Sequence, residues 1–292
     1  MLGQLGCLQV AARGLGLEVR VHDREENLLT VRTGSSGTPW WFSLSRTPFN
    51  NEAQAALCAD KAHFHAVLNA HVHMPDTLAF LDPGTDPDYQ HYVRERGVVE
   101  MAERAGDTLG LPLVVKPNSG SLGRGVRLCH DLDAVKSALA SVFDQKSRFY
   151  DYVALAQRFV PLAREYRVIS LRGEPLLAYE RSGGSEGFMA RYWETGHCQM
   201  VEDLNLLRRL GEFTRPVYEQ TGVVFAGLDV GVRERTGTHG GSDEPWVLFE
   251  ANSKPYFTHI LEAGAEAEVT RMYERLLRKE LGLGLSEGGP EG

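Results

Sequence analysis

The residues best suited to chemistry begin with one lysine and the glycine-rich loop that follows it. Lys116 lies at the end of an apolar strand over 111–117, and the loop 118–126 contains three glycines. Glycines let backbone N–H groups turn toward an anion, and the lysine adds a point charge. Because the lysine precedes the glycines, this is neither a Walker loop nor a Rossmann motif. The segment predicts a flap over the phosphates of a nucleotide; an ordinary β-hairpin with a glycine turn is the alternative.

A second group consists of two acidic residues and an asparagine. Glu250 and Asn252 are two apart in a strand over 246–252, so they point to one face. Asp229 faces the same site if its strand, 225–233, pairs with theirs. Two carboxylates and an amide oxygen suit Mg²⁺ bound together with phosphates. The alternative is a structural ion pair between Glu250 and an arginine, since an unpaired buried carboxylate is costly.

Basic residues lie between these two groups. Glu165 and Arg167 alternate on one strand, Arg181 ends the next, and Arg191 follows a glycine-containing loop. Arginines near a nucleotide neutralise phosphate charge as an acyl phosphate forms, and Glu165 can accept ribose hydroxyls. Taken singly, each of these charges is more often a solvated surface residue.

Four histidines, His63, His65, His71 and His73, raise the alternative of a transition-metal site. A helix would place His63 and His65 about 200° apart. We therefore favour solvated histidines over a metal site.

The composition limits the classes of protein. The chain has 292 residues, a net charge of -8, 31 glycines and four scattered cysteines. The negative charge argues against a nucleic-acid partner. The sequence contains no apolar run near the roughly 18 residues of a membrane span, and its start lacks signal-peptide features. These features predict a cytoplasmic globular enzyme.

The elements that position the candidate residues divide into four segments. We expect a short N-terminal α/β lobe over 1–55, a small lobe with the glycine-rich loop over 56–150, a C-terminal lobe with the metal site over 151–282, and a flexible tail over 283–292. Helices are predicted over 3–14, 51–70, 90–109, 133–145, 203–221 and 262–280. Strands are predicted over 17–23, 27–33, 39–45, 111–117, 126–130, 152–160, 166–172, 175–181, 225–233 and 246–252.

Five motifs in this order make the chain resemble the ATP-grasp superfamily. They are DKAHFHAVLNAHVHMPDT (60–77), VVKPNSGSLGRGV (114–126), QRFVPLAREYRV (157–168), AGLDV (226–230) and FEANSKP (249–255). The resemblance runs from about residue 15 to 280 and is greatest to the glutamate–amine and peptide-type ligases. These include the ribosomal-protein glutamate ligase, cyanophycin synthetase, N-acetylglutaminylglutamine synthetase and the glutathione-synthetase half of the fused enzyme. It implies an α+β ATP-grasp fold in which two lobes clamp a nucleotide.

The resemblance also implies a role for each candidate residue. Asp229, Glu250 and Asn252 would hold Mg²⁺, which Mn²⁺ could replace, and Arg167, Arg181 and Arg191 would face the phosphates or the acyl phosphate. Glu165 would bind the ribose. ATP would be contacted by Lys61, Lys116, the loop residues Ser119, Gly120, Ser121, Gly123 and Gly125, and the hinge residues Gln157, Arg158 and Phe159.

The implied reaction is ATP-dependent amide formation between a carboxylate and an amine, with an amino acid or peptide as substrate. The alternative is an ATP-binding regulatory subunit or a kinase-like phosphotransferase of the same fold. Lys254 and Tyr256 stand where many relatives have a proline–glycine turn, so they either shape specificity or mark a divergent acceptor. Because the N-terminal lobe is short, the acceptor site could be completed by the second subunit of a homodimer or by another protein.

Overall fold

A computed structural model of the chain describes residues 2–120, 123–182, 197–234 and 246–283. Its strands form three sheets, with the orders β1-β2-β3, β4-β7-β5-β6 and β10-β9-β8-β11-β12. The strands are β1 (Glu18–Val21), β2 (Leu28–Arg32), β3 (Trp40–Ser43), β4 (Thr77–Leu81), β5 (Leu113–Pro117), β6 (Arg127–Cys129), β7 (Val153–Arg158), β8 (Leu162–Leu171), β9 (Glu174–Ser182), β10 (His197–Met200), β11 (Phe225–Arg233) and β12 (Trp246–Asn252).

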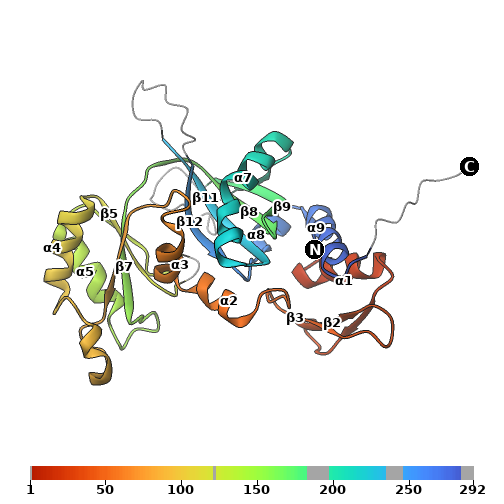
Figure 1. Ribbon diagram of the computed structural model, residues 1–292, viewed down its shortest axis with the longest axis horizontal. Helices are drawn as coiled ribbons and strands as arrows, with labels where there is room; N and C mark the ends of the chain where they lie inside the picture. The colour runs from red at the N-terminus through yellow and green to blue at the C-terminus, as the bar shows by residue number, and fades with distance from the viewer. Residues whose placement is uncertain (1, 121–122, 183–196, 235–245, 284–292) are drawn as a thin grey trace, which may run out of the picture.

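Helices cover the sheets, and Figure 1 shows the three sheets spread along the long axis of the molecule. The helices are α1 (Gln4–Gly14), α2 (Glu52–Ala59), α3 (Lys61–Leu68), α4 (Val98–Leu109), α5 (Leu132–Val142), α7 (Leu204–Thr221), α8 (Thr258–Glu262) and α9 (Glu266–Glu280), with a 3-10 helix η1 (Pro87–Tyr92). Among the described helices, none has both the length and the apolar character needed to cross a membrane.

The central five-stranded sheet positions most of the candidate residues. Because side chains alternate between faces, Tyr166 and Val168 of β8 point to one face and pack with α7. On the other face, β8 presents first Glu165 and Arg167 and then the apolar Ile169. That second face is therefore half charged and half apolar.

The apolar half is covered by the two ends of the described chain. Leu8 of α1, Phe42 of β3 and Leu276 of α9 pack in one core with Ile169 and Phe225 of the central sheet. The sheet β1-β2-β3 therefore packs on the face of the central sheet that also carries the charged residues. It covers the apolar half of that face and not the charged half.

The four-stranded sheet holds the glycine-rich segment. Val115 of β5 and Ala156 of β7 face a core made with α4 and α5. Their neighbours Lys116 and Gln157 consequently point to the opposite face, away from these helices.

The structure corrects several predicted elements. The helix expected over 51–70 is interrupted at Asp60, which ends α2 and whose side chain caps α3 by accepting from the N–H of His63. The helix expected over 90–109 begins only at Val98, after η1. The final helix, expected over 262–280, begins only at Glu266 as α9, and the short helix α8 ends at Glu262 before it. Strands β4 and β10 were not predicted.

Close packing between α7 and β9 gives a stability prediction. A Cβ at Gly211 would lie 2.8 Å from Cδ of Pro175, well inside normal contact. Gly211→Ala should therefore lower the free energy of unfolding by about 1–3 kcal/mol in urea titrations, although alanine is the better helix former. Gly14→Ala in α1 is the matched control, because its Cβ would meet no atom within 4 Å. Equal stability of the two variants would contradict the packing.

Candidate functional site

The charged half of the central sheet is assembled by strand register. Asp229 of β11 lies opposite Arg167 of β8 on one side and opposite Glu250 of β12 on the other. Arg181 of β9 lies opposite Glu165. The strands 225–233 and 246–252 do pair, which was the condition for Asp229 to share a site with Glu250, and four strands bring these five side chains to one patch.

Asp229 is held between two buried guanidinium groups. Its Oδ1 lies 2.5 Å from Nε of Arg167 and 2.8 Å from Nη2 of Arg181, and its Oδ2 accepts from Nη2 of Arg167 at 3.0 Å. Arg181 also pairs with Glu165. Burial raises the pKa of Asp229, while the two arginines oppose that shift and favour the ionised carboxylate. The structural ion pair that the sequence left open is therefore made by Asp229, not by Glu250.

Glu250 instead faces the lysines. Its Oε2 lies 3.7 Å from Nζ of Lys61, and its Oε1 accepts from Nδ2 of Asn252 at 3.2 Å. Burial alone would raise the pKa of Glu250, but Lys61, Lys116 and Arg167 hold it down at about 2. Glu250 is therefore ionised throughout the neutral pH range.

Lys116 is a buried cation on the facing sheet. Its Nζ donates to Oε1 of Gln157 at 3.0 Å, and Nε2 of Gln157 donates to Thr77 at 2.8 Å. Burial lowers the pKa of Lys116 to about 8, and Glu250 opposes that shift. Gln157 therefore lies beside the lysine, within the cluster of charges.

The glycine-rich loop starts from this lysine. Lys61 Nζ donates to the carbonyl oxygen of Gly120 at 2.5 Å, so the loop lies next to the cluster. Gly123 and Gly125 have φ values of 62° and 76°, which other residues rarely adopt. At Gly125 a Cβ would also meet Cγ of Pro117 at 2.9 Å. Ser119 belongs to the described part of the loop, whereas Ser121 and Arg191 lie outside the described residues.

The other two candidate hinge residues, Arg158 and Phe159, make contacts of a different kind from those of Gln157. The side chain of Arg158 pairs with Asp76 at 3.0 Å between Nε and Oδ2, in an exposed position outside the charged cluster. The N–H of Phe159 donates to the carbonyl oxygen of Pro112 at 3.4 Å. The structure therefore brings Gln157 to the cluster but not the side chain of Arg158.

The cluster has an excess of positive charge. It contains the four cations Lys61, Lys116, Arg167 and Arg181 and the three carboxylates Glu165, Asp229 and Glu250. With all seven groups ionised, the sum is one positive charge. A polyanion together with a divalent cation fits this arrangement, because the carboxylates and Asn252 supply hard oxygen ligands next to the cations.

Gly227 and Asn118 belong to the site although the sequence did not single them out. A Cβ at Gly227 would lie 3.1 Å from Nη1 of Arg167, so this glycine leaves room for the guanidinium. A glycine inside an otherwise apolar strand, two residues before Asp229, was the available signal. Asn118 accepts from the N–H of Ala62 at 2.8 Å and so joins the loop to α3.

The histidines do not form a metal centre within the described residues. His63 lies 3.2 Å from Asp60, and Nε2 of His65 lies 3.2 Å from the carbonyl oxygen of Pro75. Burial lowers the pKa values of His65 and His73. His65 therefore supports the turn after α3.

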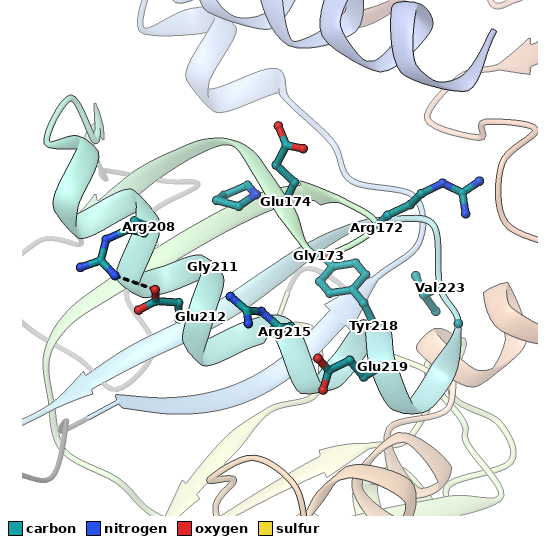
Figure 2. A pocket seen from close by; sticks show the side chains of 12 residues that line it. Arg172, Gly173, Glu174, Arg208, Gly211, Glu212, Arg215, Tyr218, Glu219 and Val223 are labelled. Carbon is teal, nitrogen blue, oxygen red and sulfur yellow. Dashed lines mark hydrogen bonds and ion pairs between the residues drawn. The ribbon is translucent and has the colours of Figure 1, made fainter. Parts of the chain in front are cut away.

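A surface groove lies at the other end of the central sheet, between α7 and the turn that joins β8 to β9 (Figure 2). It measures about 590 Å³. The charged residues that line it are three arginines and three glutamates: Arg172, Arg208, Arg215, Glu174, Glu212 and Glu219. These charges balance, and Arg208 pairs with Glu212 at 2.5 Å. The groove therefore lacks the excess charge that marks the cluster.

Comparison with known proteins finds similarity in sequence to one domain family and to one group of enzymes. A family model described as the ATP-grasp domain of prokaryotic glutathione synthetase matches residues 94–235. A D-alanine–D-alanine ligase from Bacillus anthracis is 24% identical over 192 residues, which is 62% of this chain and 58% of that protein. The chain thus spans under two thirds of the length of this relative.

Solved structures with the same architecture carry the comparison further. The structure of the D-alanine–D-alanine ligase of Bacillus anthracis complexed with ATP matches with a TM-score of 0.51 at 21% identity. The match covers 79% of this chain and 70% of the ligase chain. The VanG D-Ala:D-Ser ligase of Enterococcus faecalis has a TM-score of 0.53 at 17% identity, covering 80% and 63%. The chain therefore has the α+β ATP-grasp fold. The sequence relative and the two solved structures named above are ligases.

The clamp on Asp229 gives a prediction about stability. Asp229→Asn removes the carboxylate charge between two buried guanidinium groups, which should cost about 3–5 kcal/mol of unfolding free energy in guanidinium titrations. Asp133→Asn is the control, since its side chain is 92% exposed and its ion pair with Lys136 is at the surface. A loss of less than about 0.5 kcal/mol for Asp229→Asn would contradict the clamp.

Proposed function

We propose that the chain is an ATP- and Mg²⁺-dependent ligase that joins a carboxylate to an amine through an acyl phosphate. The observation that carries the proposal is the cluster itself. Lys61 and Lys116 lie beside the glycine-rich loop. Both lysines face Glu250 on the central sheet. The cluster's excess positive charge suits the phosphates of a nucleotide.

Each group of residues has a part in this proposal. Lys61, Lys116 and the glycine-rich loop bind the phosphates, and the segment Gln157–Phe159 reads the adenine with Glu165 at the ribose. Arg167 and Arg181, together with Arg191, neutralise the charge that develops on the transferred phosphoryl group. The oxygens of Asp229, Glu250 and Asn252 hold Mg²⁺ or Mn²⁺, which shields the phosphate charge when bound.

The chemistry needs positioning and charge neutralisation more than a protein nucleophile. A substrate carboxylate attacks the γ-phosphate of ATP, and ADP leaves. An amine then attacks the acyl phosphate, inorganic phosphate leaves, and an amide forms. Because the relatives include a D-alanine–D-alanine ligase, we propose an amino acid or a peptide as the substrate.

Further parts of the proposal concern organisation and compartment. We propose lobes over 1–55, 56–150 and 151–282, and a homodimer as one way to complete the acceptor site. The tail expected over 283–292 lies, from residue 284 on, outside the described residues. We also propose a cytoplasmic location, because four scattered cysteines suit a reducing compartment.

The proposed reaction is tested by the dependence of ADP and phosphate release on two substrates. The protein is incubated with Mg²⁺, ATP and pools of amino acids and dipeptides, and the products are identified by mass spectrometry. Release that requires both a carboxylate and an amine, with an amide product, is the expected result. A stable phosphorylated product without an amine requirement would indicate a kinase-like enzyme instead. Nucleotide binding without turnover would indicate a regulatory subunit.

Glu250→Gln should abolish turnover while leaving the fold intact. The variant keeps the shape of the side chain but removes the charge that faces Lys61 and the proposed metal. Phosphate release is measured beside circular dichroism, with Glu219→Gln on the exposed face of α7 as the control. Retained activity in Glu250→Gln would disprove the metal assignment.

Binding of ATP should weaken as the pH rises through about 8, where free Lys116 loses its proton. The ammonium attracts the phosphates and the neutral amine does not, so affinity is greatest below pH 7. Lys116→Met should weaken binding about tenfold or more at pH 7 and should flatten the pH dependence between 7 and 9. Isothermal titration calorimetry measures both effects, with Lys136→Met in α5, outside the cluster, as the control. A pH profile that is the same in Lys116→Met and the wild type would contradict the assignment.

A further inference from the structure

The first residues of the glycine-rich loop, Asn118 to Gly120, are tied to two other parts of the chain, the start of α3 and the segment 151–153. We refer to these first residues as the loop base. The N–H of Asn118 donates to the carbonyl oxygen of Val153 at 3.1 Å, which continues the contact between β5 and β7. The side-chain oxygen of Asn118 accepts from Ala62 at the start of α3. Lys61 donates to the carbonyl oxygens of Asn118 and Gly120 at 3.3 and 2.5 Å.

A further contact to the loop base comes from Asp151, in the connection that leads into β7. Its Oδ2 accepts from the N–H of Ser119 at 2.6 Å, and its Oδ1 accepts from the N–H of Val153 at 3.1 Å. Asp151 is only 6% exposed. Both carboxylate oxygens of a buried acid are thus used by backbone N–H groups, which are the strong, charge-assisted kind of hydrogen bond.

One peptide group of the loop base is held at both ends by opposite charges. The carbonyl of Asn118 and the N–H of Ser119 belong to the same peptide unit, and in a trans peptide they point in opposite directions. The oxygen accepts from the ammonium of Lys61, and the N–H donates to the carboxylate of Asp151. The plane of this peptide is therefore fixed between a cation and an anion.

We infer that Asp151 is a positioning residue for nucleotide binding, which acts through the 118–119 peptide on the loop base and on Lys61. This inference rests on the proposed function, because it concerns the same nucleotide site. By turning the N–H of Ser119 toward itself, Asp151 turns the carbonyl of Asn118 toward Lys61. That carbonyl holds the ammonium of Lys61 in the position from which it also faces Glu250.

A local turn alone does not account for Asp151. The bond to Val153 spans two residues and resembles an ordinary turn contact, whereas the bond to Ser119 spans 32 residues and is shorter. Asp144, in the same connection between α5 and β7, makes only the local kind of bond, from its Oδ1 to the N–H of Lys146 at 3.0 Å. Asp144 is therefore a natural control.

The test compares variants by their affinity for a non-hydrolysable ATP analogue with Mg²⁺. Asp151→Ala should weaken binding about tenfold and speed hydrogen exchange of the Ser119 amide, without a similar change in β5 and β7. Asp151→Asn keeps one carbonyl acceptor and should recover part of the affinity. Asp144→Ala should bind like the wild type. If Asp151→Ala does not fold, Asp151→Asn alone carries the comparison with Asp144→Ala.

A double-mutant cycle separates positioning from general destabilisation. Because Asp151 is proposed to act through Lys61, Asp151→Ala combined with Lys61→Met should bind little worse than Lys61→Met alone. The inference would be overturned if the losses of affinity in the two single variants simply multiplied in the double variant. It would also be overturned by wild-type affinity in Asp151→Ala, or by faster hydrogen exchange spread evenly over the four-stranded sheet. A wild-type protein that does not bind the analogue would instead overturn the proposed function, so the two failures are distinguishable.

Discussion

The ion pairing of Asp229 with Arg167 and Arg181 is the interaction on which the candidate site depends. Three charges buried on adjacent strands are stable only as a group, because each desolvated charge needs its partner. Their pairing fixes the register of β8, β9 and β11 at the charged end of the sheet. Glu250 then lies opposite Asp229 through the pairing of β11 with β12. The site is therefore a product of strand register more than of any single loop.

One face of the central sheet carries both the charged site and part of the apolar core, on the same strands. Along β8 the period of two places charged residues at one end and Ile169 and Leu171 at the other, where α1, α9 and the first sheet cover them. The apolar half supplies burial that offsets the cost of the charged half. The four-stranded sheet contributes Lys116, which faces the central sheet. The four-stranded sheet has its own core beneath α4 and α5.

Much of this could be read from the sequence, because the strongest patterns were local. The apolar runs predicted the strands, and the spacing of Glu250 and Asn252 predicted that these two side chains share a face; the pairing of the two strands was left as a condition. The sequence did not reveal that Asp229 would take the arginines, since that depends on the register with β8. Nor did it reveal the break at Asp60, because a capping aspartate inside an alanine-rich run leaves the helical spacing intact. Strand β10 is short and contains polar residues, so it lacks a strand pattern of its own.

The packing of α1 against α9 also bears on how the molecule folds. Leu5 and Leu8 share a core with Leu276 and Leu277, although almost the whole described sequence separates the two helices. During synthesis, the apolar face of α1 must wait for α9 to emerge before its final contacts can form. Contacts between such distant segments slow folding and prolong the exposure of apolar surface. The four-stranded sheet, whose core comes from a continuous stretch, can form before that closure.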